Sequence, residues 1–233
     1  MNKQSNIYTV IYIIILVVVV GTALALTSMS LKDRQQANED NDRRRQILAS
    51  VNITPAPENI QAEFDKYITG QVVINENGEK IGDNAFAISV AAQSKVAAAE
   101  RLLPLYICEI DGTKKYIIPL YGAGLWGPIW GYLSLNEDGS TIYGAYFDHQ
   151  GETPGLGAEI TKEAFYGQFP GKTLFKDGEF LPVSVVKNGQ KPLGNEDYVN
   201  GISGGTITSK GVSAMLADCL SPYKTYLKTL RAE

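Results

Sequence analysis

The chain has 233 residues, of which 44% are hydrophobic, and a formal net charge of −4. This length suits one domain of ordinary size with an accessory segment, and the composition allows a packed core. An acidic chain lacks the basic surface that a polyanion needs, so we expect no nucleic-acid partner. Cys108, Cys219 and His149 are the only cysteines and histidine. We therefore expect no metal site, and two buried free thiols in place of a disulfide.

The first predicted element is a membrane anchor over residues 1–30. The run from Ile7 to Leu26 carries no charge, and at ~1.5 Å per residue it can cross the ~30 Å hydrocarbon core of a bilayer. A cleaved signal peptide is the alternative, because Ala23-Leu24-Ala25 resembles a cleavage site. The run is longer than the apolar core of a typical signal peptide, and Lys3 is the only charge before it. We therefore predict an uncleaved anchor.

Residues 31–57 are predicted to form a polar helical stalk or linker. As far as Ser50 the segment is charged and free of glycine and proline, with Leu31, Ile47 and Leu48 as its few apolar residues. We expect it to be solvated. The sequence TPAPE, Thr54 to Glu58, breaks the helical pattern. Residues 58–233 are assigned to the folded domain.

Hairpin signals dominate the first part of the domain. The turn dipeptides Asn77-Gly78, Asp111-Gly112, Asp138-Gly139 and Asp177-Gly178 each lie between apolar runs. Helical patterns cover roughly residues 91–103, 162–168 and 209–230. This mixture predicts an α+β domain, built of β-hairpins with packed helices.

The last predicted helix follows a segment rich in glycine and hydroxyl groups, NGISGGTITSKGV, Asn200 to Val212. Glycines permit a positive φ and the close approach of another group. Ser203, Thr206, Thr208 and Ser209 could cap the helix. The start of a helix also favours a phosphate, because its free N–H groups form a positive dipole end. Local physics leaves open a simple capped helix and an anion site.

A hydrolase is a further alternative for the same segment. Gly201 to Gly205 match the G-x-S-x-G pattern of a nucleophile elbow around Ser203. The pattern requires a preceding buried strand, whereas NEDYVN is polar. It also requires a histidine after the serine, whereas His149 precedes it. These departures make the hydrolase the weaker interpretation.

Two other glycine-rich segments lie in the middle of the chain. GAGLWGPIW, Gly122 to Trp130, places Leu125 and Trp126 in a turn, and HQGETPGLGAEI, His149 to Ile160, carries Glu152. Such loops can present backbone amides to a flat polar ligand while Leu and Trp flank its faces. They could equally be surface turns.

Together, the blocks GLWG, GETPGLG and GISGGTITS, behind one N-terminal span, resemble the C subunit of the sodium-translocating NADH:quinone reductases. The resemblance covers most of the chain. It implies an FMN attached through a phosphoester to the last threonine of an Asp-x-x-Ser/Thr-Gly-Ala-Thr motif. That threonine is Thr206 here, with Asn200 in place of Asp and Gly205 in place of Ala.

The resemblance also implies the surroundings of the flavin. The residues expected to bind FMN, besides the attachment residue, are Glu152, Thr153, Gly155, Leu156, Leu125, Trp126, Ser203, Gly204, Gly205, Ile207, Thr208 and Ser209. The flavin would carry electrons between cofactors of the complex, with no catalytic residue of the chain and no activity of the chain alone.

The implied partners are the other subunits, a flavin transferase for maturation, and membrane lipid. The implied location is the bacterial inner membrane, with the domain on the periplasmic side. The basic residues after the span, Lys32, Arg34 and Arg43 to Arg45, favour the cytoplasmic side instead, although large domains translocate largely regardless of charge. The alternatives are the G subunit of an Rnf-type ferredoxin:NAD oxidoreductase, and a cofactor-free membrane-tethered binding or assembly domain.

Overall fold

The computed structural model describes residues 6–231 and divides the chain into two compact units, Met1–Arg43 and Arg44–Glu233. Residues 1–5 of the predicted anchor, including Lys3, lie outside the described residues. The first unit consists of the greater part of helix α1 (Asn6–Ala49). An 18-residue window of this helix has a mean hydropathy of 2.8, and none of the window is buried. The helix is long and apolar enough to cross a membrane, as the anchor prediction requires.

The last turns of α1 belong to the second unit, in place of a solvated stalk running to residue 57. Gln46, Ile47, Leu48 and Val51 are buried. The guanidinium carbon of Arg44 lies 4.9 Å from the centroid of the Phe86 ring. Of the three apolar residues named above, Ile47 and Leu48 are buried at the end of the helix, whereas Leu31 is 40% exposed. The TPAPE break therefore lies inside the domain and not at its edge.

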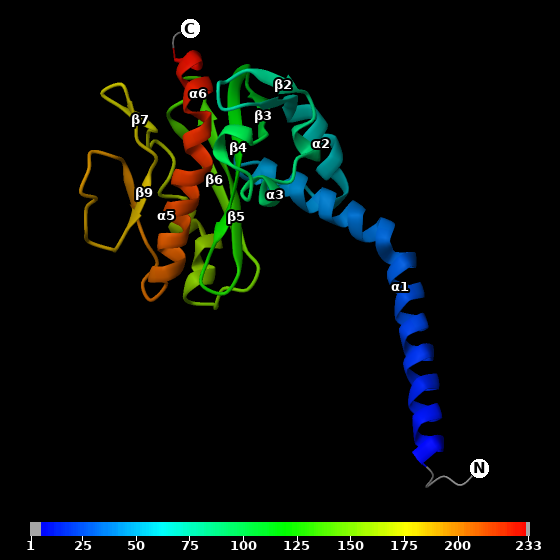
Figure 1. Cartoon of the computed structure of the whole chain (residues 1–233). Helices are drawn as coiled ribbons and strands as arrows, with labels where there is room; N and C mark the ends of the chain where they lie inside the picture. The colour runs from blue at the N-terminus through cyan, green and yellow to red at the C-terminus, as the bar shows by residue number, and fades with distance from the viewer. Residues whose placement is uncertain (1–5, 232–233) are drawn as a thin grey trace. The chain divides into compact units, whose positions relative to one another are not determined.

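The second unit is built on a six-stranded antiparallel sheet with the order β2-β1-β3-β4-β5-β6 (Figure 1). The strands are β1 (Ile68–Ile74), β2 (Lys80–Gly82), β3 (Leu103–Ile110), β4 (Thr113–Ala123), β5 (Pro128–Asn136) and β6 (Ile142–His149). Turns at Asn77-Gly78, Asp111-Gly112 and Asp138-Gly139 connect three of its strand pairs, which confirms these hairpins. Asp111 and Gly112 have φ angles of 50° and 73°, as a type I′ turn requires.

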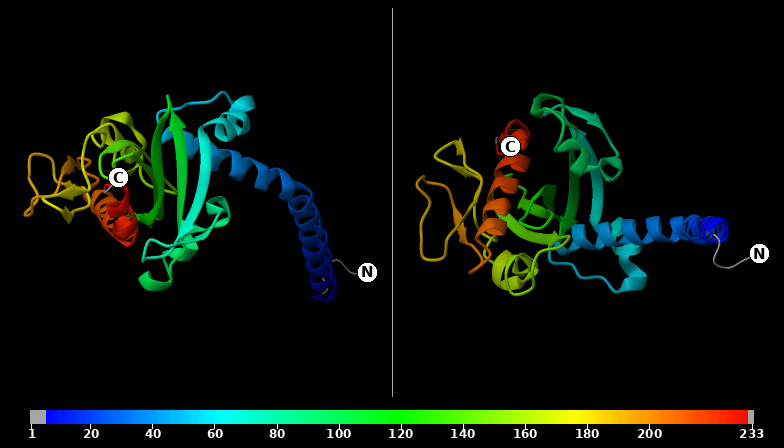
Figure 2. Two further views of the ribbon diagram at one scale, coloured as in Figure 1. Left: turned by 90° about the horizontal axis from the view of Figure 1, so that it is seen from above. Right: turned by 60° about the horizontal axis from the view of Figure 1, so that its bottom comes forward.

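Both faces of the sheet are covered (Figure 2). Helices α5 (Thr206–Leu220) and α6 (Lys224–Leu230), joined by the 3₁₀ turn η5 (Ser221–Tyr223), pack on one face. Helix α2 (Ile60–Tyr67) and the end of α1 pack on the other. Trp130 of β5 donates a hydrogen bond to the side chain of Gln46 at 3.1 Å. The predicted α+β class is confirmed.

The predicted helix over 91–103 is wrong. The chain forms only α3 (Val90–Gln93) and the 3₁₀ turn η3 (Ala98–Glu100) before β3 begins. No residue between 91 and 100 is buried. A short helix needs a buried apolar face for its stability, and this alanine-rich run offers none. The other short helical elements are η1 (Pro57–Asn59), η2 (Ala85–Ala87), η4 (Gly157–Thr161) and α4 (Glu163–Tyr166).

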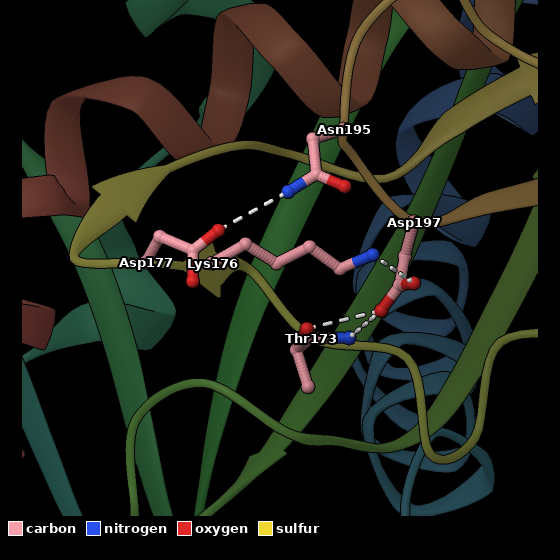
Figure 3. Close-up of polar contacts among 5 residues, drawn as sticks. All are labelled: Thr173, Lys176, Asp177, Asn195 and Asp197. Carbon is pink, nitrogen blue, oxygen red and sulfur yellow. Dashed lines mark hydrogen bonds and ion pairs between the residues drawn. The ribbon is translucent and has the colours of Figure 1, made fainter.

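The segment before α5 forms two small sheets. They consist of the antiparallel pair β7 (Phe175–Lys176) and β8 (Glu179–Phe180), and the parallel pair β9 (Ser184–Val186) and β10 (Tyr198–Asn200). The first pair confirms the hairpin at Asp177-Gly178. The Asp197 carboxylate accepts hydrogen bonds from Thr173 N at 2.7 Å and from Thr173 Oγ1 at 3.0 Å, and forms an ion pair with Lys176 Nζ at 2.9 Å. Figure 3 draws these contacts. These contacts fix the chain where it enters β10.

Both cysteines are free thiols. Cys108 is fully buried, and burial raises the pKa of its thiol to about 11. Cys219 is partly buried; its sulfur accepts a hydrogen bond from Tyr121 N at 3.4 Å and donates one to Tyr121 O at 3.3 Å. The expectation of free thiols is confirmed, with only Cys108 buried completely.

Candidate functional site

One buried carboxylate joins three segments that are far apart in the sequence. Glu152, in the loop after β6, is 4% exposed. Its Oε1 accepts a hydrogen bond from Trp126 N in the β4–β5 turn, at 2.8 Å. Its Oε2 accepts one from the Thr208 hydroxyl in the first turn of α5, at 2.5 Å. The GLWG, GETPGLG and GISGGTITS segments therefore meet around this side chain.

Glycines allow this close approach. A Cβ at Gly157 would collide with both the Glu152 carboxylate and the Thr208 hydroxyl, and a Cβ at Gly124 would collide with the same carboxylate. A Cβ at Gly211 of α5 would collide with the carbonyl oxygen of Ala123, at the end of β4. The start of α5 is thus held against the β4–β5 turn by contacts that no larger residue would permit.

The four hydroxyl groups of the segment fall into two pairs. Thr208 and Ser209 are buried, and both hydroxyl groups are hydrogen-bonded. The Thr208 hydroxyl donates to Glu152, and Ser209 Oγ accepts a hydrogen bond from Ile202 N at 2.9 Å. Ser203 and Thr206 are exposed, and neither hydroxyl forms a hydrogen bond within residues 6–231. Two of the four are available to a ligand.

None of these hydroxyls caps the helix, so the simple capped helix, one of the two interpretations that local physics left open, does not form. Helix α5 begins at Thr206, three residues earlier than predicted, with Gly205 at the N-cap position and no side-chain cap. Its first turn contains no acidic residue. The N–H groups of this turn are therefore left for water or a ligand.

Four apolar side chains are exposed on the three segments that meet at Glu152. Leu125, Trp126, Leu156 and Ile207, here called the apolar rim, are 48%, 69%, 43% and 57% exposed. The other large apolar side chains of residues 44–231 with comparable exposure are Ile81 and Leu193. Gly204 has a φ of 76°, and a Cβ on it would lie 2.7 Å from Leu156 Cδ2, so Leu156 lies directly against the segment that carries Thr206.

Thr153 and Gly155 shape the loop that presents Leu156. The carbonyl of Thr153 accepts hydrogen bonds from the N–H groups of Leu156 and Ala158, at 3.1 and 3.2 Å. Gly155 has a φ of 76° and donates its N–H to Glu159 Oε1 at 3.0 Å. Both residues act through their backbone in this structure.

A cavity of about 540 Å³ opens beside Thr206, and Ser203, Gly204 and Ser209 also line it. Its other walls include Lys187, Asn188, Gln190 and Lys210, which the sequence-based site did not contain. Lys210 could have been found, because it follows Thr206 by one helical turn. The loop after β9, which contributes Lys187, Asn188 and Gln190, contains no sequence motif that indicates a binding site. A larger hollow of about 750 Å³, around Lys114 and Asp138, contains no residue of the predicted site.

The hydrolase interpretation gains no support from the geometry. His149 Nδ1 accepts a hydrogen bond from Glu152 N at 3.1 Å. No hydrogen bond joins this imidazole to Ser203 in the described part of the chain. In a hydrolase triad, a carboxylate orients the histidine through Nδ1. Here Nδ1 of His149 is already bonded to the backbone of its own loop.

The chain is similar to known proteins over most of its length. The model of the FMN-binding domain family matches residues 124–221, a segment that includes every residue of the predicted site. The C subunit of the Na(+)-translocating NADH-quinone reductase of Yersinia pestis is 31% identical, covering 91% of this chain and 87% of its own. The corresponding chain of Pseudomonas aeruginosa is 30% identical, covering 92% and 91%.

Solved structures show the same fold. The crystal structure of the Na(+)-translocating NADH-quinone reductase C subunit from Parabacteroides distasonis superposes with a TM-score of 0.79 at 51% identity, covering 84% of this chain and 96% of that chain. The structure of Shewanella oneidensis NqrC has a TM-score of 0.71 at 24% identity and is evidence for the fold alone.

Proposed function

Because this chain belongs to the family of C subunits of the Na(+)-translocating NADH-quinone reductases, we propose that it holds one FMN through a phosphoester to Thr206 and relays electrons within that complex. The family and the FMN-binding domain make the chain a flavoprotein subunit of an oxidoreductase complex. The covalent link, its position and the relay are the content of the proposal.

The accessibility of Thr206 is the observation that carries the proposal. Thr206 is exposed, and its hydroxyl has no hydrogen-bond partner within the described chain. It stands at the first residue of an uncapped helix, whose N–H groups and dipole favour a phosphate. Ser203 is also exposed but lies before the helix, and Thr208 and Ser209 are committed to internal contacts. Thr206 is therefore the acceptor best placed for a phosphate.

The apolar rim fits the flat ring of a flavin. Leu125, Trp126, Leu156 and Ile207 leave apolar surface in water that a bound isoalloxazine would cover. FMN supplies the redox chemistry when bound, and the protein supplies position and surroundings. Glu152 acts as a positioning residue, because it fixes the turn that carries Trp126 against the helix that carries Thr206.

The departures from the family motif are compatible with attachment. A Cβ at Gly205 would lie 3.0 Å from the Cβ of Ile202, so an alanine there would require Ile202 to shift by a few tenths of an ångström, which the glycine does not. The backbone of Asn200 exchanges two hydrogen bonds with the Gln168 side chain, at 2.9 and 3.2 Å. We propose that a flavin transferase recognises this turn, and that the domain lies on the periplasmic side of the inner membrane.

The test is the intact mass of the chain isolated from its native membrane. We expect the sequence mass plus one FMN less one water, and the sequence mass alone for Thr206→Ala. Ser203→Ala is the matched control and should retain the flavin. An unmodified native chain would support the cofactor-free tether instead, and a flavin retained by Thr206→Ala would move the attachment to another residue.

A further inference from the structure

The cavity beside Thr206 is positively charged although the chain as a whole is negative. Lys187 and Lys210 line it, and no carboxylate does, while the formal net charge of the chain is −4. Neither lysine forms an ion pair within residues 6–231. The exposed side chains of Lys187 and Lys210 therefore line the same cavity, and neither is paired with a carboxylate.

The secondary structure explains why both lysines reach the same hollow. Lys210 follows Thr206 by four residues in α5, so the two side chains lie on one face of the helix. Lys187 directly follows β9, where Val186 pairs with Asn200 and accepts a hydrogen bond from Gly201 N at 2.7 Å. The pairing of β9 with β10 therefore carries Lys187 to the turn that precedes Thr206.

We propose that this cavity is a phosphate-binding site, in which Lys187 and Lys210 hold the phosphate of the flavin both before and after it is joined to Thr206. The inference rests on the proposed attachment to this threonine. A phosphate monoester carries close to two negative charges at neutral pH, and a phosphodiester carries one. Ammonium groups stabilise either form through charge-assisted hydrogen bonds.

The excess of positive charge is confined to this cavity, because charges of opposite sign offset each other in the adjoining hollow. An adjoining hollow of about 360 Å³ shares Gly201 to Ser203 and Asn188 with it, and is lined by both Glu159 and Lys162. There the two charges offset each other, and the Glu159 carboxylate is further engaged by the N–H of Gly155 at 3.0 Å. The apolar rim, of which Leu156 lies against Gly204, would receive the ring.

Riboflavin separates the phosphate site from the ring site, because it has the ring of FMN and lacks the phosphate. The full-length Thr206→Ala chain, purified in detergent, keeps both sites and cannot form the ester. We expect it to bind FMN about tenfold more tightly than riboflavin, roughly threefold from each exposed lysine. High salt should reduce this preference, because it screens exposed charges.

The lysine variants are made in the same Thr206→Ala chain. Lys187→Met with Lys210→Met should bring the FMN-to-riboflavin affinity ratio close to one, while Lys210→Arg should preserve most of it. Lys191→Met is the matched control, because Lys191 lies in the same loop outside the lining of the cavity, and it should leave the ratio unchanged. Equal affinities for the two flavins, binding of neither, or a preference that survives the double substitution would each overturn the proposal.

The flavinylated chain provides an independent measurement by phosphorus NMR. Lys210→Met should shift the ³¹P resonance of the attached phosphate, and Lys191→Met should not. A resonance that is unchanged in Lys187→Met and in Lys210→Met, on chains whose mass shows the flavin, would refute the lysine site while leaving the attachment intact. A native chain without flavin would refute the attachment itself, so the two failures are distinguishable.

Discussion

Replacing Thr208 with valine tests whether the Glu152 contact organises the site. The substitution preserves the shape of the side chain and removes its hydroxyl. That hydroxyl donates to Glu152 Oε2 at 2.5 Å, in a place where the glutamate is only 4% exposed. The variant therefore leaves a buried carboxylate oxygen without its donor, while the bond from Trp126 N to the other oxygen remains.

The expected loss in the free energy of unfolding is about 2 kcal/mol. A hydrogen bond to a charged group contributes roughly 1.5–3 kcal/mol, and an unpaired buried acceptor costs about as much. For a domain of this size each kcal/mol lowers the melting temperature by roughly 2–4 °C. Thr208→Val should thus melt about 4–8 °C below the unchanged chain.

The measurement is urea and thermal unfolding of the full chain in detergent, followed by circular dichroism. Thr225→Val is the matched control, because Thr225 lies exposed in helix α6, and it should change the free energy of unfolding by less than about 0.5 kcal/mol. If Thr208→Val proves as mild as this control, the Glu152 contact is not what holds the three segments together.

Three further predictions concern the domain around the site. Asp197→Asn should destabilise the chain by about 1 kcal/mol at pH 7, because it removes a carboxylate that the folded chain stabilises. Burial raises the pKa of Asp197, but the contacts with Lys176 and Thr173 outweigh burial and lower that pKa. The stabilisation is therefore present above the unfolded pKa of about 4 and is lost as the pH falls through the lower folded pKa. The free energies of unfolding of the two chains should therefore converge as the pH falls below the unfolded pKa. Cys108 should resist iodoacetamide at pH 8 until urea unfolds the chain, since a pKa of about 11 leaves roughly a thousandth of a buried thiol ionised; alkylation of the native chain would contradict this. A chain that begins at Arg44 should fold, whereas one that begins at Thr54 should not, because it lacks three buried apolar side chains worth about 5–9 kcal/mol, an amount comparable with the stability of a domain; two chains of equal stability in urea would refute this.

The hairpins were predictable because a tight turn requires a positive φ at two adjacent residues, and the types of those two residues alone indicate it. Asp111-Gly112 and Asp177-Gly178 both have positive φ at each position, which few other dipeptides tolerate. The failed predictions concern segments whose state depends on distant partners. Ile47 and Leu48 are buried only because the second face of the sheet is there to receive them. Residues 91–100 had helix propensity but no such surface.

The candidate site divides in the same way. The motifs identified which segments take part, and the structure identifies what joins them, since neither the Glu152 to Thr208 contact nor the position of Lys187 follows from local sequence. The simple capped helix does not form for a related reason. Serine and threonine at a helix start usually cap it, but here Ser209 and Thr208 are engaged by Ile202 and Glu152 instead.

The start of α5 decides which hydroxyl groups are exposed to a ligand. Successive helical residues are turned by about 100°, so four of them divide between two sides of a helix. Thr206 and Ile207 face outward, and Thr208 and Ser209 face inward. The inward pair fastens the helix to the Glu152 loop and to the preceding turn. Because that fastening fixes the rotation of the helix, it also fixes the outward direction of Thr206 and of Lys210, one turn later. The buried hydroxyls thus position the exposed one, and the proposed attachment of FMN to Thr206 depends on both pairs.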